Sequence, residues 1–217
     1  MPILRGKPVS SGIVSAPCHL HNSLVQQVVK EPAEPVTSVE KELNRLLNAV
    51  KKSRAQLKKI YMTVEKKMGS SSALIIGIQR QLLDDPSLIR EITDLISGGQ
   101  IRCETAIRQV EQKYIDIFSK IPDLTFQERK NDLSDILQRI AGNLTSRHQP
   151  GGKRESTYIL VAQDLHPSKA AQIMSSGLVA GLVLEEGGEN SHTSILARTM
   201  GIPAIINVTH ALRTIKE

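Results

Sequence analysis

Hydrophobic positions recur at helical spacing through the middle of the chain and form short runs near its two ends. Between residues 39 and 68 the apolar positions follow steps of mainly three and four, which predicts one long amphipathic helix. Gly69 predicts the end of that helix, and the serines at 70–72 predict a cap for the next. Short loops between the predicted helices favour an antiparallel bundle. The further helices are predicted over residues 73–83, 87–99, 101–118 and 126–144.

The two ends of the chain have a different pattern. A turn followed by a strand is predicted over residues 12–20. After residue 156, strands and helices alternate, which is typical of an α/β domain. The strands are predicted over 158–162, 178–184 and 204–208, and the helices over 168–174 and from Asn190 or Ser191 to Gly201.

Two proline-containing joints, residues 30–36 and 149–156, separate these patterns. Proline disfavours both helix and continuous strand, so each joint is a candidate domain boundary. We therefore predict an α/β domain built from residues 1–32 and 149–217. An all-helical subdomain, residues 33–148, is inserted into it.

Composition narrows the class of protein. Apolar residues make up 40% of the 217 positions, but no apolar run approaches the ~18 residues of a transmembrane helix. No leader opens the chain, so we expect a cytoplasmic protein without a membrane partner. Cys18 and Cys103 lack the spacing of a zinc cluster or a disulfide framework. An aromatic content of 2% argues against a stacking platform for single-stranded nucleic acid.

The chain has a formal net charge of +6. A basic surface suits nucleic acid, a phosphorylated ligand or an acidic protein. Many of the positive residues alternate with apolar ones on the long predicted helix, which favours a solvated helix face, and we expect no nucleic-acid partner. These residues are Lys51, Lys52, Arg54, Lys58, Lys59, Lys66 and Lys67. His19 and His21 share a strand face without a third ligand nearby, so no metal site is predicted.

His192 is the main candidate for chemistry. It follows two glycines that allow a tight turn, and it falls in the first turn of a predicted helix, where N–H groups and the helix dipole suit an anion. Thr193 and Ser194 are placed to add donors, while Asn190 and Ser191 also suit helix capping. By itself such a histidine is more often structural. Arg198 suits a surface or inter-element ion pair, and Asp164 suits a turn cap or a histidine partner.

A longer string around His192 is more specific. Gly187-Gly-Glu-Asn-Ser-His-Thr-Ser-Ile-Leu-Ala-Arg198, followed by Pro203-Ala-Ile205, resembles the phosphohistidine signature of the PEP-utilising enzymes, which include enzyme I, pyruvate phosphate dikinase and PEP synthase. The resemblance implies a swivelling phosphohistidine domain in which His192 carries a phosphoryl group on Nε2. Ser191, Thr193 and His166 are the other site residues that it implies.

Four further segments resemble enzyme I of the bacterial phosphotransferase system: residues 6–16, 82–88, 128–135 and 159–168. In that family the helical insertion docks the phosphocarrier HPr. The resemblance therefore implies a phosphoryl relay between PEP and HPr or a paralogue. A dikinase is disfavoured because dikinases lack this insertion.

Three departures leave an alternative open. His166 stands where the family has a threonine, and Gln79 stands where enzyme I usually has a histidine. The chain also ends at Glu217, before the barrel domain that binds PEP and magnesium in the family. We therefore expect a monomer that holds no cofactor itself and is not competent with PEP alone. The alternative is a non-catalytic regulatory module that docks HPr or a related carrier. Sugar-type and nitrogen-type pathways are both compatible.

Overall fold

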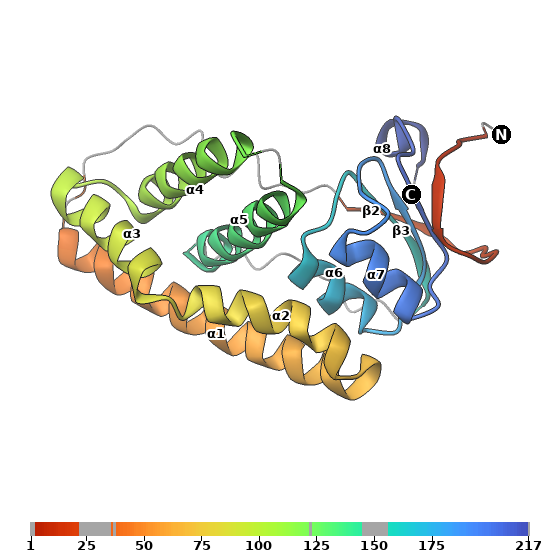
Figure 1. The fold of residues 1–217 in the computed structure, drawn as a ribbon, viewed down its shortest axis with the longest axis horizontal. Helices are drawn as coiled ribbons and strands as arrows, with labels where there is room; N and C mark the ends of the chain where they lie inside the picture. The colour runs from red at the N-terminus through yellow and green to blue at the C-terminus, as the bar shows by residue number, and fades with distance from the viewer. Residues whose placement is uncertain (1–2, 22–35, 37, 122, 145–155, 217) are drawn as a thin grey trace. The chain divides into compact units, whose positions relative to one another are not determined.

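A computed structural model describes residues 3–21, 36, 38–121, 123–144 and 156–216. Over these residues the chain has a mixed α/β fold with eight helices and one five-stranded sheet (Figure 1). None of the described helices is both long enough and apolar enough to cross a membrane. The mixed α/β class predicted from the sequence is confirmed.

Five helices follow one another through the middle of the chain. They are α1 (Val39–Met68), α2 (Ser70–Leu83), α3 (Pro86–Gly99), α4 (Cys103–Ser119) and α5 (Leu124–Leu144). The predicted apolar stripe of α1 is confirmed, since Leu46, Val50, Leu57, Ile60 and Val64 are all buried. Every helix predicted in this region is present, with ends within three residues of the prediction.

Local capping explains where these helices begin and end. Gly69 has φ +82 and ends α1, as predicted, because glycine adopts this conformation without a Cβ clash. The prediction for the serines at 70–72 was wrong: they form the first turn of α2 instead of capping it. Asp85 caps α3 by accepting hydrogen bonds from Ser87 N at 2.8 Å and Ser87 Oγ at 2.7 Å.

The sheet has the strand order β1-β5-β4-β3-β2. Its strands are β1 (Lys7–Ser10), β2 (Cys18–His21), β3 (Tyr158–Ala162), β4 (Val179–Leu184) and β5 (Ala204–Ile206). All neighbours pair in parallel except β1, which is antiparallel to β5. β1 was not predicted from the sequence, because four residues that include Pro8 on an edge strand carry no alternating pattern. Pairing with β5, far away in sequence, supplies its stability.

Three short helices complete the fold: α6 (Pro167–Met174), α7 (His192–Thr199) and α8 (Ala211–Thr214). α6 and α7 each connect two parallel neighbours, β3 to β4 and β4 to β5, and they lie side by side in Figure 1. Their buried faces carry Ala170, Ala171, Met174, Leu196 and Ala197. A separate apolar cluster joins Val161 of β3 to Val208 and Ala211.

The chain divides into two compact units. The first contains residues 1–24, 60–75 and 150–217, and the second contains residues 25–59 and 76–149. The first unit includes residues 60–75, where α1 ends and α2 begins, in addition to both chain ends. All of α1 to α5 lie between the parallel neighbours β2 and β3 in the chain. The predicted boundaries, 1–32 plus 149–217 and 33–148, stay a prediction.

Candidate active site

The candidate site lies where β3 and β4 end. In a parallel sheet the carboxyl ends of the strands share one edge, where α/β proteins usually bind ligands. Beyond the strands, Glu185 N still donates to Ala162 O at 3.0 Å, and Glu186 N donates to Gln163 O at 2.8 Å. The loops that lead to His166 and His192 therefore leave the sheet side by side.

A tight turn brings the chain from β4 into α7. Gly187 has φ +150, and a Cβ at this position would lie 3.3 Å from Ile206 Cγ2, so both backbone and space favour glycine. Ser191 N donates to Gly188 O at 3.1 Å and closes the turn. The glycines therefore allow the tight turn that was predicted from the sequence.

Ser191 is the N-cap of α7, as its sequence position suggested. Its Oγ accepts a hydrogen bond from Ser194 N at 3.3 Å. The buried Ser194 side chain donates from Oγ to Gly188 O at 2.7 Å and accepts from Ser191 Oγ at 3.1 Å. These hydroxyls fix the turn against the helix. Asn190 precedes the cap and does not fill it.

His192 is the first residue of α7 and is half-buried. Its imidazole therefore lies beside the amino end of the helix, where backbone N–H groups and the helix dipole favour negative charge. Such a helix start favours a bound anion.

Thr193 connects His192 to the other loop. Its side chain is 3% exposed, and its Oγ1 donates to Leu165 O at 2.9 Å. From its position in the sequence, Thr193 was expected to add a donor to the reacting group. In the structure this hydroxyl instead holds the loop before α6 against the start of α7.

His166 follows Leu165 and is the N-cap residue of α6. Its backbone is extended (φ −61, ψ 146), its side chain makes no capping hydrogen bond, and Pro167 fills the first position of the helix. The ring is half-buried. His166 and His192 therefore stand at the amino ends of two adjacent helices, joined through the Thr193–Leu165 hydrogen bond.

Two other candidates have structural contacts. Arg198 donates from Nη2 to Glu189 O at 3.0 Å, so it clamps the turn before α7 instead of making the predicted ion pair. Glu189 forms its ion pair with Lys7 of β1. Asp164 accepts from the N–H of the next residue, Leu165, at 2.7 Å, a local contact within the loop before α6; its predicted role as a turn cap stays a prediction.

The remaining histidines lie elsewhere. His19 packs edge-on against Tyr158, and His210 is the N-cap residue that precedes α8. His148 lies outside the described residues. His21, at the end of β2, has its pKa lowered to about 4, first by burial and then by the charges of Lys169 and His19. Lys169 on α6 was missed by the sequence analysis, since only the fold brings it near β2.

No three or more His, Cys, Asp or Glu side chains gather into a possible metal site within the part of the chain that the structure describes. The candidate site therefore places an imidazole at the first residue of a helix, with the neighbouring hydroxyls of Ser191, Thr193 and Ser194 committed to hydrogen bonds.

Two family models match the chain. The PEP-utilising enzyme N-terminal model matches residues 5–129, and the PEP-utilising enzyme mobile-domain model matches residues 154–217. The second match contains the whole candidate site.

Curated relatives agree with these matches. The chain is 32% identical over 183 residues, 82% of its length, to the phosphoenolpyruvate-protein phosphotransferase of Mycoplasma capricolum. It is 29% identical over 99% of its length to the protein of the same name from Staphylococcus aureus. The chain spans about a third of the length of these relatives, 32% and 37%.

Solved structures agree as well. The solution structure of an enzyme I protein matches 99% of this chain and 86% of its own, with a TM-score of 0.73 and 26% identity. The N-terminal domain of a nitrogen-type enzyme I shares the fold, with a TM-score of 0.64 over 94% of this chain and 83% of its own, at 22% identity. By family models, relatives and fold, this chain belongs to the PEP-utilising enzyme family and corresponds to the N-terminal domain of enzyme I.

Proposed function

We propose that the chain is a phosphoryl relay in which His192 carries the phosphoryl group between PEP and the phosphocarrier HPr or a paralogue. The observation that carries the proposal is the position of His192 as the first residue of α7, after the Gly187–Ser191 turn. The names of the relatives, phosphoenolpyruvate-protein phosphotransferase, support the reaction class.

The reaction is a transfer through a covalent intermediate. The lone pair of Nε2 attacks phosphorus, a P–N bond forms, and the P–O bond to the leaving enolate of PEP breaks. The reverse attack, by the acceptor group of the carrier, breaks the P–N bond and regenerates His192. The protein contributes position and charge stabilisation, as in other phosphoryl transfers.

The neighbouring residues take supporting roles in this proposal. The amino end of α7 stabilises the phosphoryl oxygens, while Ser191, Thr193 and Arg198 hold the turn through the hydrogen bonds described above. His166, at the family's threonine position, donates a ring N–H to a phosphoryl oxygen. Residues 154–217, which match a mobile-domain model, swivel between donor and carrier.

The test is phosphorylation by phospho-HPr. The purified chain is incubated with the phosphorylated carrier, and its intact mass is measured at alkaline pH, because phosphohistidine is labile in acid. We expect a gain of one phosphoryl group, lost in His192→Ala and retained in the control His210→Asn. Asn tolerates the left-handed backbone of residue 210, which has φ 60.

The alternative, a module that docks the carrier without transfer, rests on His166 at the helix start beside the site. It predicts no mass gain while NMR titration still detects carrier binding. Phosphorylation that persists in His192→Ala would contradict the relay through this residue.

A further inference from the structure

The turn before α7 is held at Glu189 from two sides. The backbone O of Glu189 accepts from Arg198 Nη2 at 3.0 Å, and its carboxylate forms an ion pair with Lys7 Nζ. Arg198 lies in α7 itself, whereas Lys7 lies in β1, at the other end of the chain. A residue of the first strand therefore contacts the turn that presents His192.

β1 gives Lys7 a firm base. In the register of the sheet, Lys7 lies opposite Ile206 of β5. A Cβ at the preceding residue, Gly6, would lie 2.5 Å from Val208 Cγ2 and 2.6 Å from Ile206 O, so the two segments are in close contact. At the start of the turn, a Cβ on Gly187 would also lie close to Ile206, 3.3 Å from its Cγ2. The strand that carries Lys7 and the turn are therefore packed against the same residue of β5.

The ion pair between Lys7 and Glu189 is exposed, with 57% of one side chain and 47% of the other accessible to solvent. Exposed pairs stabilise a whole fold only weakly, so global stability should depend little on this one. Its location has a different consequence, because small displacements of a reacting group slow a reaction steeply. On the basis of the proposed relay function, we propose that Lys7 is a positioning residue, which acts through Glu189 to hold the turn that presents His192.

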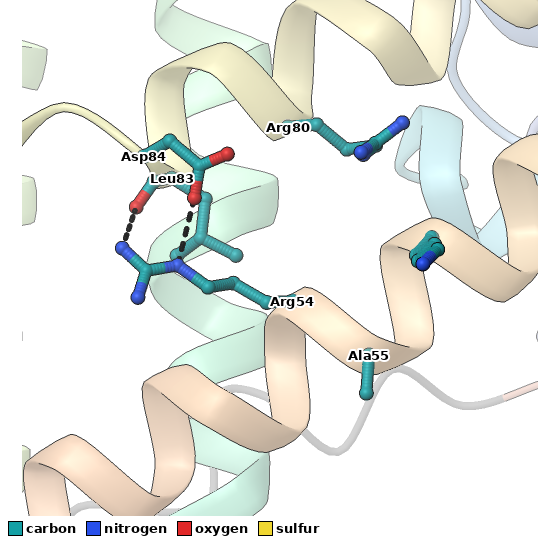
Figure 2. Close-up of a pocket in the computed structure, with 6 residues that line it drawn as sticks. Arg54, Ala55, Arg80, Leu83 and Asp84 are labelled. Atoms are coloured by element: carbon teal, nitrogen blue, oxygen red, sulfur yellow. Dashed lines mark hydrogen bonds and ion pairs between the residues drawn. The ribbon is translucent and has the colours of Figure 1, made fainter.

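A second exposed ion pair offers a matched control. Arg54 Nε donates to Asp84 Oδ1 at 2.7 Å, and the two side chains are 50% and 58% exposed. Figure 2 shows this pair beside the pocket that both residues help to line. It belongs to the second compact unit, whereas Lys7, Glu189 and His192 belong to the first. Arg54→Gln therefore removes a pair of similar type and exposure from a unit that does not contain the turn.

The rate of phosphorylation by phospho-HPr tests the proposal. The full chain is followed by intact mass at alkaline pH and low ionic strength, because salt screens exposed charges. The carrier is saturating, so that its affinity does not enter the rate. Lys7→Gln and Glu189→Gln should each slow transfer by roughly threefold to fivefold, within the range of an exposed ion pair. The double variant should be no slower than either single one, because both remove the same contact. Lys7→Arg should keep most of the rate, and Arg54→Gln should leave it unchanged.

Amide hydrogen exchange measures how firmly the turn is held, without any transfer. The N–H groups of Ser191 and Ser194 are hydrogen-bonded within the turn, to Gly188 O and to Ser191 Oγ. In Lys7→Gln their exchange, followed by NMR, should become roughly threefold to fivefold faster, because the turn opens more often. In Arg54→Gln it should not change.

Transfer by Lys7→Gln at the rate of the unaltered chain would overturn the proposal, and so would a double variant that is slower than both single variants. An equal loss of rate in Arg54→Gln would overturn it too, because the rate would then respond only to the charge of the chain. If the unaltered chain accepts no phosphoryl group, the proposed function fails. In that case unchanged exchange in Lys7→Gln overturns the positioning role as well, and faster exchange confined to Ser191 and Ser194 supports it. The NMR spectrum of each variant also reports whether it is folded.

Discussion

At the scale of single residues, several hydrogen bonds of the neighbouring side chains fix the turn and the helix start that carry His192. Thr193 is the clearest case, because its buried hydroxyl is committed to Leu165 O, in the loop that presents His166. One side-chain hydrogen bond therefore links the starts of the two helices. A substitution here should disturb transfer more than stability.

Thr193→Val tests this reading. It keeps the shape of the side chain but removes the donor, so unfolding free energy should fall by only about 1 kcal/mol. Transfer from phospho-HPr should slow by roughly tenfold or more, because displaced catalytic groups lose rate steeply. Thr193→Ser, which keeps the hydroxyl, should restore most of the rate. Equal rates for Thr193→Val and the unaltered chain would contradict the positioning role.

His21, in the edge strand β2, makes the stability of the fold depend on pH. Its pKa of about 4 lies below the ordinary value of 6.5, because burial and the charges of Lys169 and His19 disfavour the protonated ring. Between these values the unfolded chain binds a proton that the folded chain does not. The stability contributed by the neutral ring is therefore full above pH 6.5 and is lost as the pH falls toward 4.

We expect this effect to cost about 1 kcal/mol at pH 5, after allowance for the solvent that reaches the ring. Urea unfolding at pH 7 and pH 5 measures it. His21→Gln should lose less stability between the two pH values than the unaltered chain. If the unfolding free energy of His21→Gln changes as much between pH 7 and pH 5 as that of the unaltered chain, other groups cause the pH dependence.

At the scale of secondary-structure elements, a buried polar contact joins α2 to α5. Gln79, fully buried, donates from Nε2 to Asp132 Oδ1 at 3.3 Å and to Asp135 Oδ2 at 2.8 Å. Both carboxylates are also buried, with exposures of 3% and 4%. The residue that departs from the family histidine thus serves as a donor between two helices.

Gln79→Leu should lower the unfolding free energy by roughly 2–4 kcal/mol, because two buried carboxylates lose a donor. Gln112→Leu removes a similar amide–carboxylate contact, Gln112 Nε2 to Asp116 Oδ1 at 2.8 Å, but on an exposed part of α4. That control should cost less than about 1 kcal/mol. If Gln79→Leu and Gln112→Leu lower the unfolding free energy by similar amounts in urea titrations, burial does not explain the cost of Gln79→Leu.

The elements also show what the sequence could and could not predict. The apolar stripes of the helices are local patterns, and so are the residues that mark helix ends, Gly69 and Ser191. α1 to α5, β3 and α7 were therefore predictable from their own residues. β1 was not, because Lys7–Ser10 depends on β5 for its hydrogen bonds. The contacts of Thr193 with Leu165 and of Arg198 with Glu189 O were also hidden, since each joins positions that only the turn or the sheet brings together.

At the scale of the whole molecule, each compact unit is built from more than one segment of the chain. Both chain ends build the sheet, and α1 to α5 fill the interval between two of its strands. The basic residues behind the net charge of +6 also have different structural roles. Lys7 supports the turn at Glu189, while Arg54 and Lys58 line a pocket in the other unit.

The parallel pairing of β2 with β3 limits how the protein can be shortened. Because the strands run the same way, the end of β2 and the start of β3 lie at opposite edges of the sheet. A tight turn cannot bridge them. A miniature version without α1 to α5 therefore needs a crossover of about a dozen residues or more, preferably with its own short helix. An engineer who joins His21 to Tyr158 through a two-residue hairpin would reverse β3, and with it the edge that presents His192.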